Sequence, residues 1–172
     1  MTIFAERSSV EQIELGETLA PRFDAEGLMP VIVVNADDKM ILMLGYMNAE
    51  ALERTLRTRQ AHFWSRSRRA LWRKGEHSGF AQRVEHVLID DDQDALILLV
   101  TIDGPGSCHV GFRSCFYREV DLASVATDAP IRLERVEHMP AFQTQPGCDH
   151  ARRVSFTARG QSQITPGRTA NA

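Results

Sequence analysis

Two pairs of short, β-favouring apolar runs limit what this chain can fold into. The first pair spans residues 31–34 and 40–44, and the second spans residues 84–90 and 95–102. A stretch that contains aspartates separates the two runs of each pair, which is typical of a hairpin turn. Another strand is expected to begin at residues 62–64. The sequence therefore predicts a small α+β domain with a strand-dominated mixed sheet and few helices, with a mostly β domain as the alternative.

Two helices are expected beside these strands. Ser8 and Glu11 have the spacing of a capping box, so a short helix containing Ile13 and Leu19 should follow them and end at Pro21. A second helix can begin after the capping residue Asn48. Its apolar stripe would consist of Ala49, Leu52 and Leu56, with Glu53 and Arg57 forming an ion pair on the solvated side.

The composition excludes several classes of protein. Of the 172 residues, 43% are hydrophobic and 25% charged, as in soluble globular proteins. Twenty Lys and Arg residues against 23 Asp and Glu residues leave no overall basic charge for binding nucleic acid. No apolar run approaches the roughly 20 residues that span a bilayer. The three cysteines cannot all pair within one chain, so we expect a cytoplasmic protein whose thiols are metal ligands, nucleophiles or core residues.

The apolar periodicity of the sequence weakens near residue 125. We expect one domain at residues 1–125 and a C-terminal extension at residues 126–172. The end of this extension, from Gly160, has the polar and Gly/Pro-containing character of a disordered terminus. Residues 131–139 could form either a strand or a short helix.

An acidic run follows the strand predicted at residues 84–90. If that strand continues, Asp90, Asp92 and Asp94 lie on one face and Asp91 lies on the other. Three carboxylates on one face repel one another unless a cation neutralises them, and oxygen ligands suit Mg²⁺. The alternative is a solvated acidic turn, and the run taken by itself favours this alternative.

A Gly-rich loop carries two cysteines seven residues apart, Cys108 and Cys115, the first of them beside His109. Thiolates and imidazoles are ligands that Zn²⁺ prefers. These residues do not complete a zinc site, so a further ligand would have to come from elsewhere in the fold or from another subunit. Two thiols packed in the core are an equally good interpretation of the sequence.

A basic stretch at residues 64–79 concentrates positive charge between the only two tryptophans, Trp64 and Trp72. Guanidinium groups, serine hydroxyls and glycine amides are what a phosphate group needs, and an indole can stack on a base. A phosphate-binding site is therefore favoured over a merely solvated basic loop.

Taken in order, these motifs resemble the phosphoribosyl-AMP cyclohydrolase family of histidine biosynthesis. The resemblance covers about residues 28–118, through MLGYMNAEAL at Met43, FWSRSRRALWRKGEHSG at Phe63, the acidic run at Asp90 and GPGSCHVGFRSCFYR at Gly104. It implies hydrolysis of the adenine ring of phosphoribosyl-AMP between N1 and C6, with zinc activating the water and Mg²⁺ helping to hold the nucleotide substrate. It also implies an intertwined homodimer whose metal sites lie at the subunit interface.

The resemblance assigns roles to residues of this chain. It implies that Asp90, Asp92 and Asp94 hold Mg²⁺, that Cys108 and Cys115 are zinc thiolates, and that His109 is the catalytic histidine. The substrate-binding residues that it implies are Trp64, Ser65, Arg66, Ser67, Arg68, Trp72, Arg73, Lys74, Gly75, Glu76 and Ser78.

The departures from the family pattern fall at the site. Asp91 stands where the family has a third zinc cysteine, supplied across the dimer. Either the carboxylate replaces that ligand, which would harden the site towards Zn²⁺, Fe²⁺ or Mn²⁺ with weaker retention of zinc, or the ligand is lost. His77, Phe80 and Val110 also differ from the usual residues, and the GPGSC loop is one residue longer.

These departures leave alternatives to phosphoribosyl-AMP hydrolysis. The chain could be a divergent relative with reduced zinc dependence, one that acts on another purine-like nucleotide, or a non-catalytic metal- or nucleotide-binding protein. Cys148 and His150 could supply extra ligands, although an incidental polar turn is favoured. A base deaminase is excluded because its zinc motifs are absent. The end of the chain also lacks the pattern of the pyrophosphohydrolase domain that some relatives carry.

Overall fold

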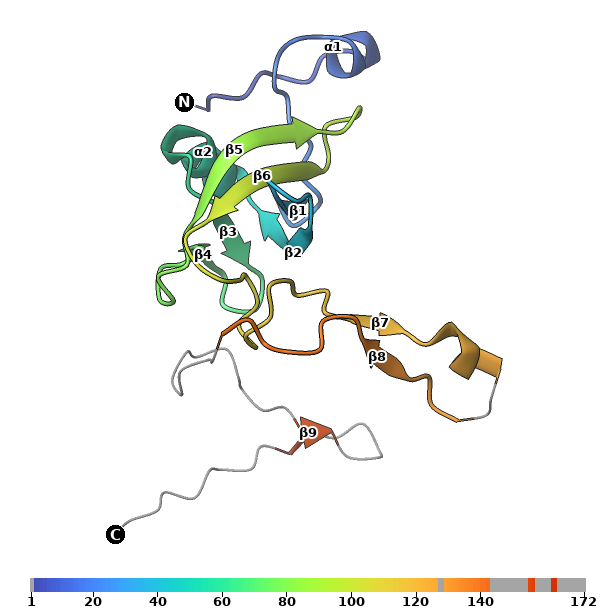
Figure 1. The fold of residues 1–172 in the computed structure, drawn as a ribbon. Coiled ribbons are helices and arrows are strands. Elements are labelled where there is room, and N and C mark those ends of the chain that lie inside the picture. The colour runs from blue at the N-terminus through green and yellow to red at the C-terminus, as the bar shows by residue number, and fades with distance from the viewer. Residues whose placement is uncertain (1, 127–128, 143–154, 157–161, 164–172) are drawn as a thin grey trace.

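The computed structural model describes residues 2–126, 129–142, 155–156 and 162–163. At its centre lies a four-stranded sheet of order β2-β1-β6-β5 (Figure 1). Its strands are β1 (Met29–Asn35), β2 (Ile41–Met47), β5 (Gln82–Ile89) and β6 (Leu96–Ile102). Both predicted hairpins are confirmed as antiparallel pairs, β1 with β2 and β5 with β6. Because β1 and β6 pair in parallel, the sheet is mixed and the α+β prediction is confirmed.

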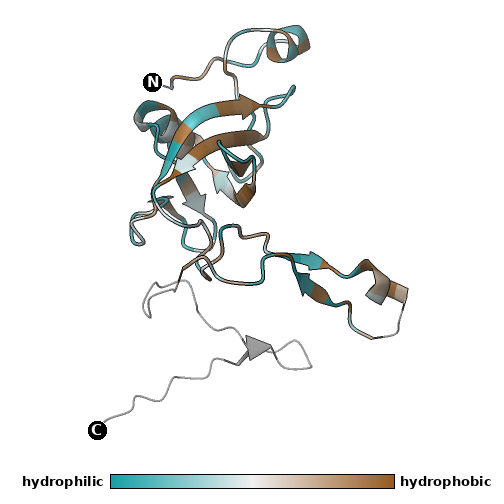
Figure 2. Cartoon of the chain, viewed as in Figure 1, coloured by the Kyte–Doolittle hydropathy of each residue, from teal (hydrophilic) through white to brown (hydrophobic). Residues whose placement is uncertain are grey.

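The hydrophobic core lies between one face of this sheet and helix α2 (Ala49–Thr58). Residues in β1 and β6 alternate between buried and partly buried, so every second side chain faces the core. Figure 2 shows hydrophobic residues along most of β6. The core side chains of the two strands are Met29, Val31, Val33, Leu96, Leu98 and Val100.

Helix α2 begins as the sequence predicts. The side chain of Asn48 accepts a hydrogen bond from the Ala51 amide at 2.9 Å, and Arg57 pairs with Glu53 at 2.8 Å. The predicted apolar stripe is only partly correct, because the buried residues are Ala51, Leu52 and Thr55, with Leu56 partly buried and Ala49 exposed. At 100° per residue, Ala49 lies about a quarter turn from the centre of that buried face.

A small hairpin packs beside the helix. It consists of β3 (His62–Ser65), as the sequence predicts, and β4 (Ala70–Arg73). Phe63 of β3 is fully buried, and an added Cβ on Gly45 of β2 would lie 2.7 Å from its ring. The missing side chain at Gly45 therefore lets the hairpin approach the sheet closely.

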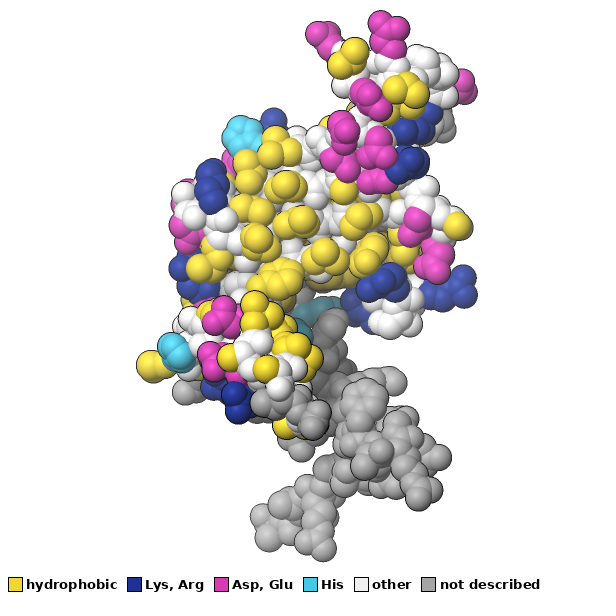
Figure 3. Space-filling model, turned by 90° about the vertical axis from the view of Figure 1, so that its right-hand side faces the viewer, with side chains coloured by type: hydrophobic (Ala, Val, Ile, Leu, Met, Phe, Trp, Pro, Cys, Tyr) yellow, Lys and Arg dark blue, Asp and Glu magenta, His cyan; other side chains and the backbone are white. Residues whose placement is uncertain are grey.

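The other face of the central sheet is apolar and largely uncovered in the part of the chain that the structure describes (Figure 3). Across the four strands, Leu44, Ile32, Ile97 and Leu88 are direct neighbours in the pairing register. Leu44 is 47% exposed and Leu88 is 50% exposed. We call this surface the apolar sheet face; an apolar patch of this kind is typical of a surface that binds another protein.

The N-terminal helix differs from its prediction. Helix α1 (Val10–Glu14) is capped by Ser9, whose hydroxyl accepts from the Gln12 amide at 3.1 Å, rather than by Ser8. It ends at Glu14 instead of continuing to Pro21, and it buries no side chain. Further turns would not be stabilised by packing, because this short helix has no apolar face in contact with the core.

Beyond the sheet, the chain forms an arm of β7 (Arg118–Val120), the 3₁₀ helix η1 (Leu122–Ala126) and β8 (Leu133–Arg135), which projects from the body (Figure 1). Of the two possibilities for residues 131–139, the strand is correct at β8. Strands β9 (Ser155–Phe156) and β10 (Ser162–Gln163) form an antiparallel pair. The rest of the terminus from Gly160 lies outside the described residues, and the division at residue 125 stays a prediction.

The described part of the chain contains no helix that is both long and apolar enough to cross a bilayer.

Candidate active site

The acidic run forms a turn, the alternative that this run alone favours, and not a continuation of β5, so the strand alternation does not apply there. Strand β5 ends at Ile89, and one carboxylate oxygen of Asp90 accepts from the amides of Asp94 at 2.9 Å and Ala95 at 3.0 Å. These bonds close the chain on itself, with Gln93 at a positive φ of 59°. The turn nevertheless brings together oxygens of Asp90, Asp92 and Asp94 within 4.8 Å of one another, a donor set that fits a hard divalent cation.

Arg22 lies against this acidic turn. Its guanidinium contacts the carboxylates of Asp92, at 2.5 Å, and Asp94. Hydrogen bonding from Arg22 lowers the pKa of Asp94. The arginine therefore neutralises part of the charge that a metal ion would otherwise neutralise. Sequence reasoning missed this residue because it lies some seventy positions upstream and belongs to no motif.

Gln93 holds the N-terminal segment against the acidic turn. Its buried side chain accepts from the Ala20 amide at 2.7 Å and donates to the Ile13 carbonyl at 2.9 Å. Arg7 adds a bond to the Asp92 carbonyl at 3.0 Å. The N-terminal segment is thus fastened to the acidic turn by buried or partly buried hydrogen bonds, which place Arg22.

Asp91 is exposed and lies outside the group of three carboxylates. The sequence predicts this separation from strand alternation, whereas in the structure it results from the turn.

The two cysteines lie in the loop between β6 and β7, residues 103–117, which we call the thiol loop. The loop turns tightly at Gly111, whose amide donates to the Cys108 carbonyl at 3.0 Å, while the Cys108 amide donates to Phe112 at 3.1 Å. Cys115 is anchored to β2, because its amide donates to the Leu42 carbonyl at 2.8 Å. Cys108 is buried, and Cys115 reaches the surface.

The pKa values of the two thiols are shifted in opposite directions. A hydrogen bond from Cys115 lowers the pKa of Cys108 to about 6, with help from backbone amides and from His109. The same hydrogen bond, together with shielding of the sulfur from water, raises the pKa of Cys115. A preformed thiolate beside a second thiol is a donor pair that fits a soft or borderline ion such as Zn²⁺.

Lys74 brings a positive charge next to this thiol pair. Its ammonium group donates to the Ser107 carbonyl at 2.5 Å. Burial lowers the pKa of Lys74, and both cysteines act in the opposite direction. Gln82 was missed by sequence reasoning: it is fully buried at the start of β5 and donates to the Ser107 hydroxyl at 3.0 Å. Its Oε1 atom has no hydrogen-bond partner among the described residues.

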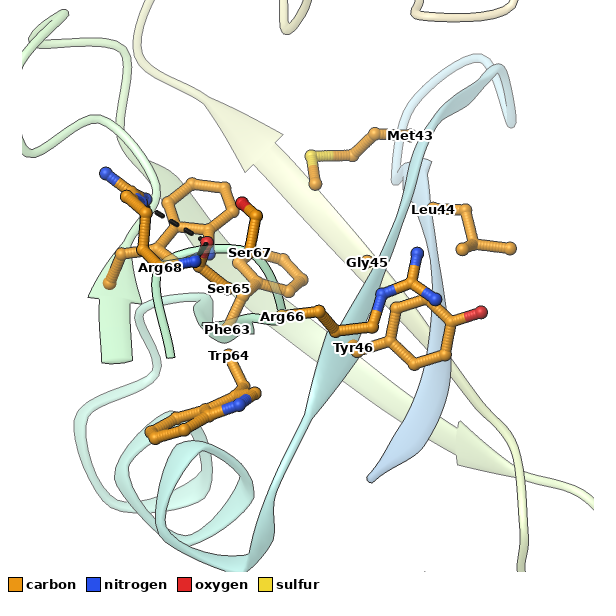
Figure 4. Close-up of a pocket in the computed structure, with 11 residues that line it drawn as sticks. Met43, Leu44, Gly45, Tyr46, Phe63, Trp64, Ser65, Arg66, Ser67 and Arg68 are labelled. Carbon is orange, nitrogen blue, oxygen red and sulfur yellow. Dashed lines mark hydrogen bonds between the residues drawn. The ribbon is translucent and has the colours of Figure 1, made fainter. Parts of the chain in front are cut away.

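The basic stretch forms the β3–β4 hairpin and its turn, which line an open groove of about 630 Å³ (Figure 4). The Ser65 hydroxyl accepts from the backbone and side chain of Arg68 at 3.3 and 3.2 Å. Arg66 lies across the ring of Tyr46, with 3.9 Å between its guanidinium carbon and the ring centre. The opposite wall is formed by residues 43–46 of β2.

The two tryptophans lie on opposite faces of this hairpin. Trp72 pairs with Phe63 across the strands and contacts its ring at 5.0 Å between centres, while the neighbouring Trp64 pairs with Leu71. Paired residues share a face and successive residues alternate. Figure 4 accordingly draws Trp64 turned away from Met43 and Tyr46. One base cannot stack on both indoles.

The other predicted substrate residues lie at the end of β4 and in the loop that follows it. Arg73 donates to the Gln60 side chain at 2.6 Å. Gly75 has a φ of 86°, and a Cβ there would lie 2.4 Å from the Ala81 amide, so this turn requires glycine. Glu76, His77 and Ser78 are exposed in this loop, and Ser67 is exposed in the turn between β3 and β4. His109 and Val110 are exposed in the thiol loop. Cys148 and His150 lie outside the described residues.

Within one chain, the thiol pair and the acidic turn lie at opposite ends of β5. Gln82 at the start of the strand contacts the thiol loop, whereas Asp90 follows its last residue. Eight extended residues span roughly 25 Å. One copy of the chain therefore joins the basic hairpin to the thiols through Lys74 but keeps the acidic turn away from them.

Comparisons with known proteins agree with this arrangement of motifs. The sequence profile of the family described as phosphoribosyl-AMP cyclohydrolase matches residues 43–117. Relatives with that name include one from Chelativorans sp., 52% identical over 67% of this chain and 82% of its own length. The relative from Sphingopyxis alaskensis is 53% identical over 69% of this chain and 97% of its own length. The chain belongs to the phosphoribosyl-AMP cyclohydrolase family of enzymes.

Proposed function

We propose that this chain hydrolyses phosphoribosyl-AMP in histidine biosynthesis, opening the adenine ring between N1 and C6. The observation that carries the proposal is the position of Cys108 and Cys115 in one loop beside the partly buried Lys74, with the pKa of Cys108 lowered to about 6. Nothing in a bare scaffold requires a thiolate and an ammonium group at that place. Identity of about half with relatives named for this reaction supports the same substrate.

Cys108 and Cys115 would hold zinc or a similar divalent ion, with Asp91 as a further ligand in place of the family cysteine. When bound, such an ion supplies a Lewis acid that makes water nucleophilic at neutral pH. His109, which follows Cys108 and is exposed, would carry a proton to or from the purine ring.

The basic hairpin would bind the nucleotide. Arg66, Arg68 and the Ser65 hydroxyl line the groove and offer donors suited to a phosphate group. Trp72 rather than Trp64 shares the groove's inner face with Phe63, so it is the better stacking partner for a base. Lys74 at the end of β4 would lie between the bound nucleotide and the thiol pair.

The acidic turn would hold Mg²⁺ and, through it, a phosphate of the substrate. Asp90, Asp92 and Asp94 offer the oxygen donors, and an ion there would compete with Arg22, which contacts one carboxylate oxygen of Asp92 and one of Asp94.

The complete site would form between two copies of the chain. Asp91 and the thiol pair belong to opposite ends of β5 in one chain, so a second copy is needed to bring them together. The apolar sheet face, with Leu44 and Leu88 half exposed, offers a surface on which that copy could pack. A homodimer with the metal sites at its interface satisfies both observations.

The test is turnover of phosphoribosyl-AMP by protein purified without added zinc, followed by metal analysis and titration with Zn²⁺ or Mn²⁺. We expect hydrolysis that depends on a divalent ion and is lost in Cys108→Ser and in Cys115→Ser, with unchanged circular dichroism. Near-normal turnover in either variant would remove the thiols from the reaction.

A second form of this function is favoured by Asp91. An oxygen ligand in place of a thiolate gives a site that retains zinc less tightly and accepts Fe²⁺ or Mn²⁺ more readily. The same titration distinguishes the two: full activity with Mn²⁺ and little zinc after purification indicates reduced zinc dependence.

A further inference from the structure

Residues 137–142, downstream of the arm, lie directly against the loop that carries Cys108. An added Cβ on Gly106 would lie 3.0 Å from the ring of Phe142, and one on Gly111 would lie 2.5 Å from the Phe142 carbonyl oxygen. These two glycines flank Cys108 on either side. At Gly111 the packing of Phe142 therefore leaves no space for a side chain, whereas at Gly106 the carbonyl oxygen of Phe112, 2.6 Å from such a Cβ, is closer than the Phe142 ring.

Hydrogen bonds fasten the same segment to the loop. The amides of Ala141 and Phe142 both donate to the Gly111 carbonyl, at 2.8 and 3.2 Å. The Glu137 carboxylate accepts from the Arg113 amide at 2.9 Å. These bonds therefore hold both ends of residues 137–142 against the loop that carries Cys108.

An aromatic contact completes this arrangement. The Phe142 ring meets Phe80 edge to face, with 5.0 Å between centres and 85° between planes. Phe80 in turn packs on Gly104 at the start of the thiol loop. Such a pair stabilises beyond its buried area, and it fixes where the segment crosses the loop.

The opposite side of the loop is held by β2. Ser114 donates its hydroxyl proton to the Ile41 carbonyl at 2.6 Å, and the Cys115 amide donates to Leu42 at 2.8 Å. Cys115 is therefore positioned by the central sheet, whereas the turn that carries Cys108 is held on its outer side by residues 137–142. The separation of the two sulfurs depends on both.

We propose that residues 137–142 are a clamp that holds Cys108 and Cys115 in the spacing needed to bind one ion, with Glu137 and Phe142 as positioning residues. The inference rests on the proposed thiolate metal site. A loop that is already ordered does not lose conformational freedom when the ion binds, so the clamp raises metal affinity without touching the metal.

Cobalt(II) is the probe, because its thiolate complexes absorb in the near ultraviolet. We expect Phe142→Ala and Glu137→Ala to weaken cobalt binding roughly tenfold. Glu137→Gln retains an oxygen that can accept from Arg113 and should bind like the wild type, which separates loss of the acceptor from loss of charge. Met139→Ala is the matched control, since Met139 lies in the same segment and is 79% exposed. Affinities of both alanine variants within twofold of wild type would overturn the clamp.

Amide hydrogen exchange in the metal-free protein makes the two proposals separable. Exchange at Cys108 and Gly111 should accelerate in Phe142→Ala and Glu137→Ala but not in Met139→Ala. A wild-type chain that binds no cobalt would refute the metal site, and with it the clamp's role in metal binding, whether or not exchange changes. Cobalt binding by the wild type with unchanged exchange in both variants would refute the clamp alone. If Phe142→Ala fails to fold, the Glu137 pair decides.

Discussion

Replacing Cys115 by alanine should raise the pKa of Cys108 from about 6 towards the ordinary thiol value near 9. The hydrogen bond from Cys115 is the largest influence that favours the Cys108 thiolate, and burial opposes it. The amides of Val110 and Phe112 and the charge of His109 remain in the variant, so part of the shift should persist. The direction follows because removing a donor from the charged form disfavours that form.

The expected difference is large at neutral pH. With a pKa of about 6, Cys108 is roughly nine-tenths thiolate at pH 7, whereas a thiol of pKa about 9 is roughly one-hundredth thiolate. Between pH 6 and the higher pKa of the variant, the wild type should carry up to one more thiolate than the variant.

Ultraviolet absorbance of the thiolate measures this directly in metal-free protein with chelator present. The wild-type and Cys115→Ala proteins should both carry Cys148→Ser, so that no thiol outside Cys108 and Cys115 titrates. Cys108→Ser then identifies which absorbance step belongs to Cys108. Two results would refute the effect of Cys115 on the pKa of Cys108. One is a wild-type step near pH 9 with none near pH 6, and the other is a step near pH 6 that survives unchanged in Cys115→Ala.

Three further changes test the acidic turn and the dimer. Arg22→Ala should strengthen Mg²⁺ binding roughly two- to fivefold, because the ion no longer competes with an exposed guanidinium; calorimetric titration giving equal affinities would show that Arg22 does not compete. Asp91→Ala should weaken transition-metal binding about ten- to a hundredfold, and Asp91→Cys should raise the preference for Zn²⁺ over Mn²⁺ in competitive titration; identical profiles would remove Asp91 from the site. Leu44→Asp should sediment as a monomer at micromolar concentration, whereas Leu15→Asp, at an equally apolar but 79% exposed position that caps the C-terminus of α1, should not; a dimer in both would place the interface elsewhere.

The parts of the fold that follow local rules could be predicted from the sequence. The β1–β2 hairpin has two apolar runs close together in the chain, and α2 has its cap at Asn48 and its ion pair at Glu53. Strand or helix periodicity acts over a few residues, so one sequence suffices to detect it. The cysteines and the acidic run were detectable because their residue types are chemically distinctive.

What depends on distant contacts could not be predicted. Arg22 reaches the acidic turn only because Gln93 fastens the N-terminal segment there, and residues 137–142 reach the thiol loop from a region with no clear pattern. Local propensity contains none of this information.

A mixed dimer tests the shared site most directly. One chain carries Asp91→Ala, the other Cys115→Ser, and each pure variant should be inactive with phosphoribosyl-AMP. If one site takes Asp91 from one chain and the thiols from the other, co-expression with two different tags gives a purified mixed dimer with one intact site. That dimer should show about half the wild-type rate per dimer, because the other site carries both changes. A mixed dimer as inactive as its parents would contradict a site built across two copies of the chain.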